Sequence, residues 1–181
     1  PHQGVCADMI ATLEGITRED IEQLAVESQC RADIAIKEGR FDKSLVPVYK
    51  DDGSLALDKE EFPRPSTTME GLAGLKPAFT DLANYPLNEE GTTYNKLVKA
   101  AYPDLDVNHI HHAGTSSGVV DGAAAIVLAS PEYAKANGLK PRARIRAVAN
   151  AGCEPELMLN APPLAAQKCA EKADIKLEDI D

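Results

Sequence analysis

The chain has 181 residues, and its 29 acidic against 19 basic residues give a formal net charge of −10. Hydrophobic residues make up 44% of it and charged residues 27%, proportions that exclude a disordered tail and a collagen-like repeat. The acidic balance argues against a general nucleic-acid binder and against a protein that binds anionic membranes. No apolar run approaches the ~20 residues of a membrane helix, so we expect a globular chain of one or two domains.

The chain start and the cysteines indicate the compartment. The first residues, PHQGVCAD, lack the basic and apolar regions of a signal peptide. Because the chain does not begin with Met, we expect Pro1 to be a processed or cut end. Four cysteines are widely spaced with no Cys-x-x-Cys pair: Cys6, Cys30, Cys153 and Cys169. This pattern favours reduced thiols in a cytosolic protein over a disulfide or zinc framework.

Two helices are predicted at the start of the chain. Gly4–Glu14 carries apolar side chains at helical spacing and is followed by Gly15, which is typical of a helix end. Thr17 and Asp20 resemble a capping box, so we expect a second helix to begin there and to end at Gly39. The apolar positions of this second helix predict the face that it buries.

A short hairpin is predicted next. Leu45–Tyr49 contains Pro47 and therefore predicts an edge or irregular strand. Asp52-Gly53 is a hairpin signal, and Ser54–Leu57 would be the return strand.

Residues 60–112 have a different character. The segment is rich in proline, and helical patterns are confined to Thr68–Leu75 and Thr92–Ala101. We expect a long, partly helical excursion here rather than a layer of regular sheet.

The last third of the chain predicts an α/β alternation. Ala123–Ala129 is a continuous apolar run typical of a buried strand, and Ala143–Ala149 predicts another. Ser130-Pro131 predicts the start of a helix between them, and Pro162 opens a last helix. The expected fold is a small α+β unit of roughly 115 residues followed by α/β pieces that look like part of a larger domain.

The run HIHH contains three of the four histidines. On an extended segment His109 and His111 share one face, whereas His112 points away. A metal site would need a further ligand at a recurring spacing, and none is evident, so packed or solvated histidines are favoured. His2, at the chain end, is expected to be solvated.

The turn Ala113–Gly118 is the segment best suited to contact a ligand, because its small residues would let a phosphate or a ligand backbone approach closely. It is neither a P-loop nor a nucleophile elbow, since no Gly-Lys-Ser/Thr follows it and the strand comes after it. A plain surface loop, closed by a turn at Asp121-Gly122, is the alternative. Cys6 and Cys153 are expected to be inert thiols, and Met158 is a packing residue on these grounds. The residues by themselves contain no complete catalytic constellation.

Four segments stand in the chain in this order: HQGVCADMIATLEGITREDIEQLAVESQCRADIAIKEGRF, LAGLKPAF, AGTSSGVVDGAAAIVLAS and NAGCEPELMLNAPPLAAQKCAEKADIKLEDID. Together they resemble the thiolase family, the acyl-CoA C-acyltransferases that make or cleave 3-ketoacyl-CoA. The resemblance implies an α/β thiolase fold. It assigns residues 1–118 to the thiolase loop domain, residues 119–152 to the end of the N-terminal domain and residues 153–181 to the start of the C-terminal domain.

The resemblance also implies which residues contact coenzyme A, which this family uses as a substrate. The expected contacts are His2 and Gln3 for the pantetheine arm, Lys76 near the adenine and phosphates, Phe79, Ala113 and Ser117 for adenosine and pantetheine, and Met158 for the acyl pocket. None of the four cysteines matches a catalytic position of the family, so no catalytic residue, metal site or further cofactor is expected here. Gln3 and Thr115 replace a commoner Met and Asn, and residues 80–112 are longer than in short-chain biosynthetic members.

The implied function is thiolytic cleavage or Claisen condensation of 3-ketoacyl-CoA through an acyl-Cys intermediate. Its partner would be acyl-CoA, without nucleic acid or membrane, in a cytoplasmic homo-dimer or homo-tetramer. Because family members run to about twice this length, we expect a central fragment that positions coenzyme A and is inactive by itself. Two alternatives stay open: a non-catalytic acyl-CoA or lipid-binding relative, and a structural oligomerisation module that binds no coenzyme A.

Overall fold

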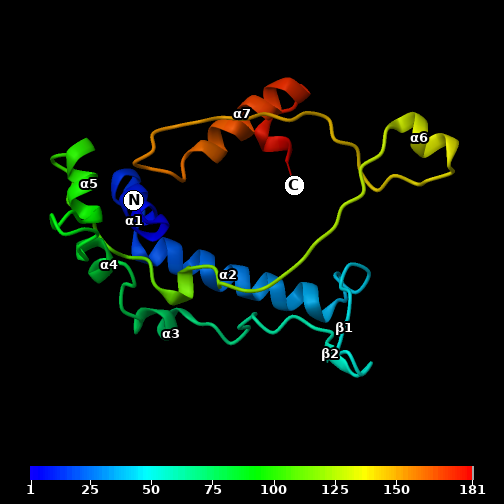
Figure 1. Cartoon of the computed structure of the whole chain (residues 1–181), viewed down its shortest axis with the longest axis horizontal. Helices are drawn as coiled ribbons and strands as arrows, with labels where there is room; N and C mark the ends of the chain where they lie inside the picture. The colour runs from blue at the N-terminus through cyan, green and yellow to red at the C-terminus, as the bar shows by residue number, and fades with distance from the viewer. Residues whose placement is uncertain (181) are drawn as a thin grey trace. The chain divides into compact units, whose positions relative to one another are not determined.

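The computed structural model describes residues 1–180 and divides the chain into two compact units, Pro1–Gly118 and a second that begins at Val119. Helices joined by long irregular segments make up most of both units (Figure 1). Among the described residues, no helix combines the length and the apolar character that a membrane span needs. The assignment of the two units to thiolase domains stays a prediction.

Two helices, α1 (Gln3–Glu14) and α2 (Arg18–Lys37), form the centre of the first unit. Gly15 ends α1 in the left-handed conformation, with φ +66°, which a residue without Cβ adopts at no steric cost. The predicted capping box opens α2, because the Thr17 hydroxyl accepts from the backbone N–H of Asp20 and the Asp20 carboxylate accepts from that of Thr17. Both helix predictions are confirmed.

The buried face of α2 coincides only in part with the one that its apolar pattern predicts, since Ile21, Ala25, Ala32 and Ala35 are half-buried. Leu24, in the expected stripe, is 71% exposed, and Glu22 is the buried residue of the helix. α2 packs against the short helix α3 (Met69–Ala73) and against a 3-10 turn, η1 (Ala113–Thr115). The side of α2 that carries Glu22 therefore faces the unit, and the predicted stripe is partly solvated.

The predicted hairpin is present at one end of α2 (Figure 1). It pairs β1 (Val48–Tyr49) with β2 (Leu55–Leu57) in antiparallel fashion, and Gly53 in the turn has φ +81°. β1 is shorter than predicted, since the preceding Pro47 has no N–H to donate to a ladder. All residues of both strands are exposed.

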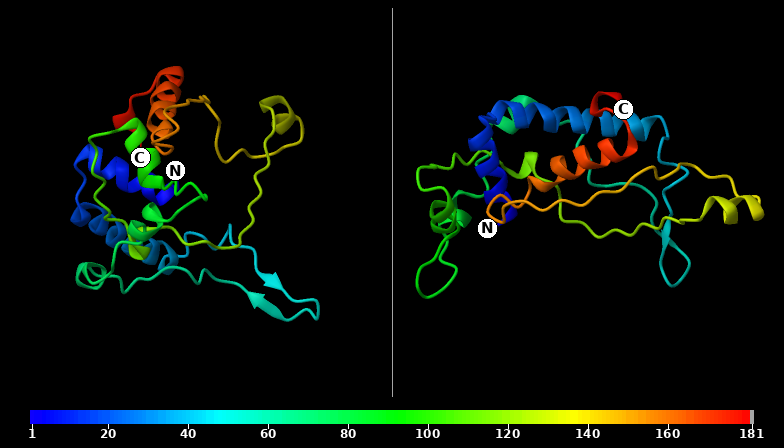
Figure 2. Two further views of the ribbon diagram at one scale, coloured as in Figure 1. Left: turned by 60° about the vertical axis from the view of Figure 1, so that its left-hand side comes forward. Right: turned by 90° about the horizontal axis from the view of Figure 1, so that it is seen from above.

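Three short helices lie along the irregular part of the first unit: α3, α4 (Thr80–Asn84) and α5 (Tyr94–Ala101). The hydroxyls of Thr68 and Thr93 cap α3 and α5, which confirms helical structure in both predicted patches. α4 is not predicted by the sequence. It packs against α1 and α5, and Figure 2 shows these helices together in both views.

The second unit contains α6 (Pro131–Ala136), α7 (Ala161–Ala173) and a 3-10 turn, η2 (Leu177–Asp179). The hydroxyl of Ser130 accepts from the backbone N–H of Tyr133, which confirms the predicted start of α6.

The two strands predicted for this unit are wrong for the described residues. Neither 123–129 nor 143–149 is paired into a sheet, and Ile126 and Val127 are 85% and 91% exposed. A strand needs a hydrogen-bonded neighbour, and the described residues supply none to either segment. The α/β layering of the expected fold is therefore not formed here, although 143–149 does contact α7, since the Arg146 guanidinium donates to the carbonyl of Ala173 over 2.8 Å.

Candidate functional site

A buried carboxylate on α1 gathers the histidine segment. Asp8 is fully buried, and its Oδ1 accepts from the backbone N–H groups of Ile110, at 3.1 Å, and of His111, at 2.9 Å. His111 Nδ1 lies 2.7 Å from the same oxygen, and His109 Nδ1 lies 2.8 Å from Oδ2. An ionised carboxylate only accepts, so both rings carry a proton on Nδ1 and a neutral ring keeps Nε2 as an acceptor.

These donors outweigh the effect of burial on Asp8. Burial by itself would raise the pKa of this carboxyl, but the hydrogen bonds from the side chain and backbone of His111, from His109 and from Ile110 hold the pKa below its usual value. Asp8 is therefore charged and fully satisfied in its buried position.

A second buried network lies between α2 and the turn at residue 112. Glu22 Oε1 accepts from Arg18 Nε at 2.6 Å and from His112 Nε2 at 3.0 Å. His112 is fully buried, and its Nδ1 accepts from the backbone N–H of Gly114 at 3.2 Å. These two contacts fix the tautomer, since Nδ1 can accept only if Nε2 carries the proton. Burial would raise the pKa of Glu22, but its bonds to Arg18 and then His112 lower it overall.

The predicted geometry of the histidine run is confirmed. His109 and His111 meet the same carboxylate, whereas His112 points to the other side and meets Glu22. The rings are packed and hydrogen-bonded rather than solvated. Within the part of the chain that the structure describes, no group of three or more His, Cys, Asp or Glu side chains is arranged to hold a metal ion.

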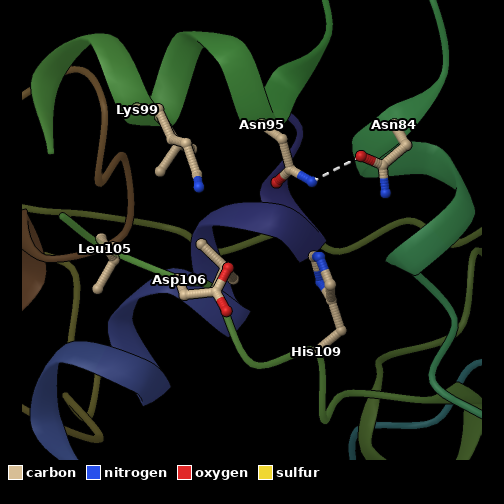
Figure 3. A pocket seen from close by; sticks show the side chains of 8 residues that line it. Asn84, Asn95, Lys99, Leu105, Asp106 and His109 are labelled. Atoms are coloured by element: carbon tan, nitrogen blue, oxygen red, sulfur yellow. Dashed lines mark hydrogen bonds between the residues drawn. The ribbon is translucent and has the colours of Figure 1, made fainter. Parts of the chain in front are cut away.

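A cavity of about 260 Å³ opens between α4, α5 and the segment before His109 (Figure 3). It is lined by Asn84, Asn95, Val98, Lys99, Leu105, Asp106, Val107 and His109. Asn95 Nδ2 donates to Asn84 Oδ1 over 2.9 Å at its rim. This lining includes no residue that the resemblance assigns to coenzyme A.

Three of the expected contacts cluster at the start of α1. His2 caps this helix, its Nδ1 accepting from the backbone N–H of Gly4 at 3.1 Å, and the imidazole lies 5.6 Å from the ring of Phe79, centroid to centroid. A Cβ on Gly4 would clash with the Cδ1, Cε1 and Cζ atoms of the Phe79 ring, so the absence of a side chain there lets the aromatic ring approach. Gln3 is exposed at the first position of the helix.

Three more expected contacts lie on two adjacent segments. Lys76, Ala113 and Ser117 are all exposed. The backbone N–H of Ala78 donates to the carbonyl of His111 at 2.9 Å, which joins the segment of Lys76 to that of Ala113. Met158, the remaining expected contact, lies in the second unit, 45% exposed and with φ +52°. The structure thus gathers all the expected contacts except Met158 on the first unit.

Sequence reasoning missed Asp8, Glu22 and Arg18. A signal for Asp8 was present, because it is an acidic residue between Val5 and Met9 on the buried face of a helix, and such a charge needs partners. A signal for Glu22 was its spacing of four residues from Arg18, which predicts an ion pair but not its burial.

Comparison with known proteins shows which proteins this chain resembles. Residues 1–83 match the family model described as thiolase, N-terminal domain. Over 98% of its length the chain is 40% identical to a 3-ketoacyl-CoA thiolase of Vibrio parahaemolyticus serotype O3:K6. The chain is similar to thiolases over nearly its whole length.

Further thiolases agree with this. A 3-ketoacyl-CoA thiolase of Marinobacter nauticus is 39% identical over the same share of the chain. The crystal structure of the Bacillus anthracis acetyl-CoA acetyltransferase aligns with a TM-score of 0.75 at 35% identity, covering 98% of this chain and 39% of that one. The chain spans about 40% of the length of the thiolases that it matches.

Proposed function

We propose that this chain is the coenzyme A-holding part of an acyl-CoA C-acyltransferase that cleaves or forms 3-ketoacyl-CoA. The observation that carries the proposal is the arrangement of the first unit. The rings of His2 and Phe79 lie in a tilted contact at the start of α1, and one backbone hydrogen bond joins the segment of Lys76 and Phe79 to the turn that begins at Ala113. The aromatic ring of Phe79 is suited to an adenine and the exposed cation of Lys76 to a phosphate. The turn of small residues and the nearby His2 are suited to a narrow pantetheine arm.

The charge balance supports a local role for Lys76. Coenzyme A carries several phosphate charges, and a chain with net charge −10 must offer a cation where they bind. Lys76 is exposed and precedes Pro77, which biases it toward an extended backbone that projects the side chain outward. Coenzyme A would be a substrate here, and the proposal includes no resident cofactor.

The bond-making groups of the family fall outside these 181 residues. We propose that the nucleophilic Cys, the oxyanion hole and the proton-transferring Cys belong to other parts of the full-length protein. The chain contributes contacts to coenzyme A and no catalytic residue. The full-length protein would act in the cytoplasm as a homo-dimer or homo-tetramer.

The test is to remove the charge of Lys76 in the full-length protein. Lys76→Ala should raise the KM for coenzyme A by about threefold to tenfold, since a charge-assisted contact at an exposed site contributes about 1 kcal/mol. The KM for pantetheine thioesters without the nucleotide should stay constant. Steady-state thiolysis at low and at high salt measures both, and the effect should shrink as salt screens the charge.

Lys76→Arg is the matched control and should keep most of the affinity. Equal changes for coenzyme A and for the short pantetheine substrates would mean that Lys76 does not contact the nucleotide. If the full-length protein binds coenzyme A without turnover, it is a non-catalytic relative of the family instead.

A further inference from the structure

Glu22 joins two series of hydrogen bonds, and each series ends on a different segment of the candidate coenzyme A surface. The first series runs through Arg18, whose Nη2 donates to the carbonyl oxygens of Leu72 at 3.0 Å and Leu75 at 2.7 Å. Leu75 is the residue directly before Lys76. The guanidinium therefore ties the segment that carries Lys76 to α2.

The second series of hydrogen bonds runs through His112. Its ring receives the backbone N–H of Gly114, and its carbonyl accepts from the hydroxyls of Thr115, at 3.1 Å, and Ser116, at 2.9 Å. The backbone N–H of Thr115 donates to the same carbonyl at 3.0 Å. His112 thus organises the turn between Ala113 and Ser117, and Glu22 fixes the ring of His112.

We infer that Glu22 is a positioning residue for coenzyme A, which sets the spacing between the Lys76 segment and the Ala113–Ser117 turn through Arg18 and His112. The inference rests on the proposed function of this surface. It adds Glu22, Arg18 and His112 to the residues that serve this function, and none of these three would touch the ligand.

The burial of these groups explains why the spacing is fixed. The side chains of Glu22 and His112 are 6% and 0% exposed, so the polar atoms of these two side chains must keep their partners, whereas the Arg18 side chain is 30% exposed. Removing the carboxylate would leave the guanidinium and the imidazole without their shared acceptor. The turn after His112 would lose this link to α2, and Arg18, which holds Leu72 and Leu75, would lose the partner that orients its guanidinium. The backbone hydrogen bond from Ala78 to His111 would still join the Lys76 segment to the segment that leads into the turn.

The experiment compares two carboxylates on the same helix in the full-length protein. Glu22→Gln keeps the shape of the side chain and removes its charge. Glu27→Gln is the matched control, because Glu27 pairs with Arg31 Nε at 2.5 Å with the same i,i+4 spacing but is half exposed and touches neither segment. Both variants are assayed below their melting temperatures.

Glu22→Gln should raise the KM for coenzyme A by about fivefold or more, the size of a typical coupling between sites, with little change in kcat. Glu27→Gln should change neither constant. A purely structural role would reduce the active fraction and thereby kcat, with an unchanged KM. Combined with Lys76→Ala, Glu22→Gln should have less than its separate effect, since the two act on one contact.

A second variant keeps the inference testable if Glu22→Gln does not fold. Arg18→Lys keeps a cation beside Glu22 but lacks the fork that reaches the carbonyls of Leu72 and Leu75. It should raise the KM for coenzyme A and leave that for pantetheine thioesters unchanged.

The experiments distinguish failure of the positioning role from failure of the proposed function. If Lys76→Ala raises the KM for coenzyme A while Glu22→Gln and Arg18→Lys do not, the positioning role is overturned and the binding surface stands. If Lys76→Ala has no effect either, the proposed function fails and the inference falls with it.

Discussion

At the scale of single residues, Asp8 links the first helix to a segment more than 100 residues later in the chain. A buried charge is costly unless every lone pair finds a donor, and Asp8 finds two imidazoles and two backbone N–H groups. This cluster fixes the path of the segment that leads into the Ala113–Ser117 turn. Asp8 therefore affects the candidate binding surface without belonging to it.

Asp8→Asn should lower the free energy of unfolding by about 2 to 4 kcal/mol, because the amide has one acceptor oxygen and no charge for four donors. Urea unfolding monitored by circular dichroism measures the loss. Asp33→Asn is the control, since Asp33 forms an exposed pair with Lys37 at 2.6 Å and should cost less than about 1 kcal/mol. Equal losses in the two variants would contradict a special role for the buried carboxylate.

The same variant gives a prediction for pH. Because the hydrogen bonds lower the pKa of Asp8 in the folded state, its contribution is fully present above the unfolded value of about 3.9. The contribution is lost as pH falls through the folded pKa. The difference in stability between the natural protein and Asp8→Asn should therefore be constant at neutral pH and shrink below about pH 4. A difference that is already lost between pH 7 and pH 5 would point to other groups.

At the scale of elements, the packing of the Phe79 ring against α1 depends on a glycine in that helix, Gly4. A side chain at Gly4 would overlap the Phe79 ring, whereas the Cβ of a substituted Gly71, in α3, would be 3.5 Å from the nearest atom, the hydroxyl of Thr68. The two glycines thus differ in the space beside them, although both are helical.

Gly4→Ala should destabilise the protein and raise the KM for coenzyme A, because the ring of Phe79 must move. Gly71→Ala should be neutral or stabilising by up to about 1 kcal/mol, as expected for alanine in a helix with room for Cβ. Thermal unfolding and thiolysis kinetics of both variants in the full-length protein check this. A Gly4→Ala variant as stable and as active as the natural protein would show that Phe79 has no fixed place.

At the scale of the whole molecule, the two units differ in how well their apolar residues are covered. The buried core of the first unit includes Val5, Met9 and Val98, all with no exposed surface. In the second unit Val119, Ile126 and Val127 are exposed almost completely. Exposed apolar runs of this kind mark surfaces that other protein segments cover.

The 181-residue chain assayed by itself should show no thiolysis of acetoacetyl-CoA, because the groups proposed to make and break bonds are not among its residues. A spectrophotometric assay against the full-length protein at equal concentration tests this. Turnover by the pure chain at an enzyme-like rate would require a nucleophile within it, and Cys6 and Cys153 would be the first to replace with serine.

Local structure could be predicted from the sequence where neighbouring residues decide it. Gly15, the Thr17 capping box, the Asp52-Gly53 turn and Ser130 act through contacts within a few residues, and the helices and the hairpin stand where these signals predict them. Alternation along an extended segment also separated His112 from the other two histidines of the run. The resemblance to thiolases could be recognised because the motifs that carry it are runs of adjacent residues in a fixed order.

Only the tertiary structure decided which charges are buried and what they bind. Asp8 and Glu22 face partners about 100 and 90 residues away, and no local pattern encodes such a pairing. The same reason explains the two errors of the sequence analysis. The exposed position of Leu24 and the absence of paired strands over 123–129 and 143–149 in the described residues depend on what lies beside them. Burial and strand pairing are properties of two segments together, so one segment's composition can favour them but cannot establish them.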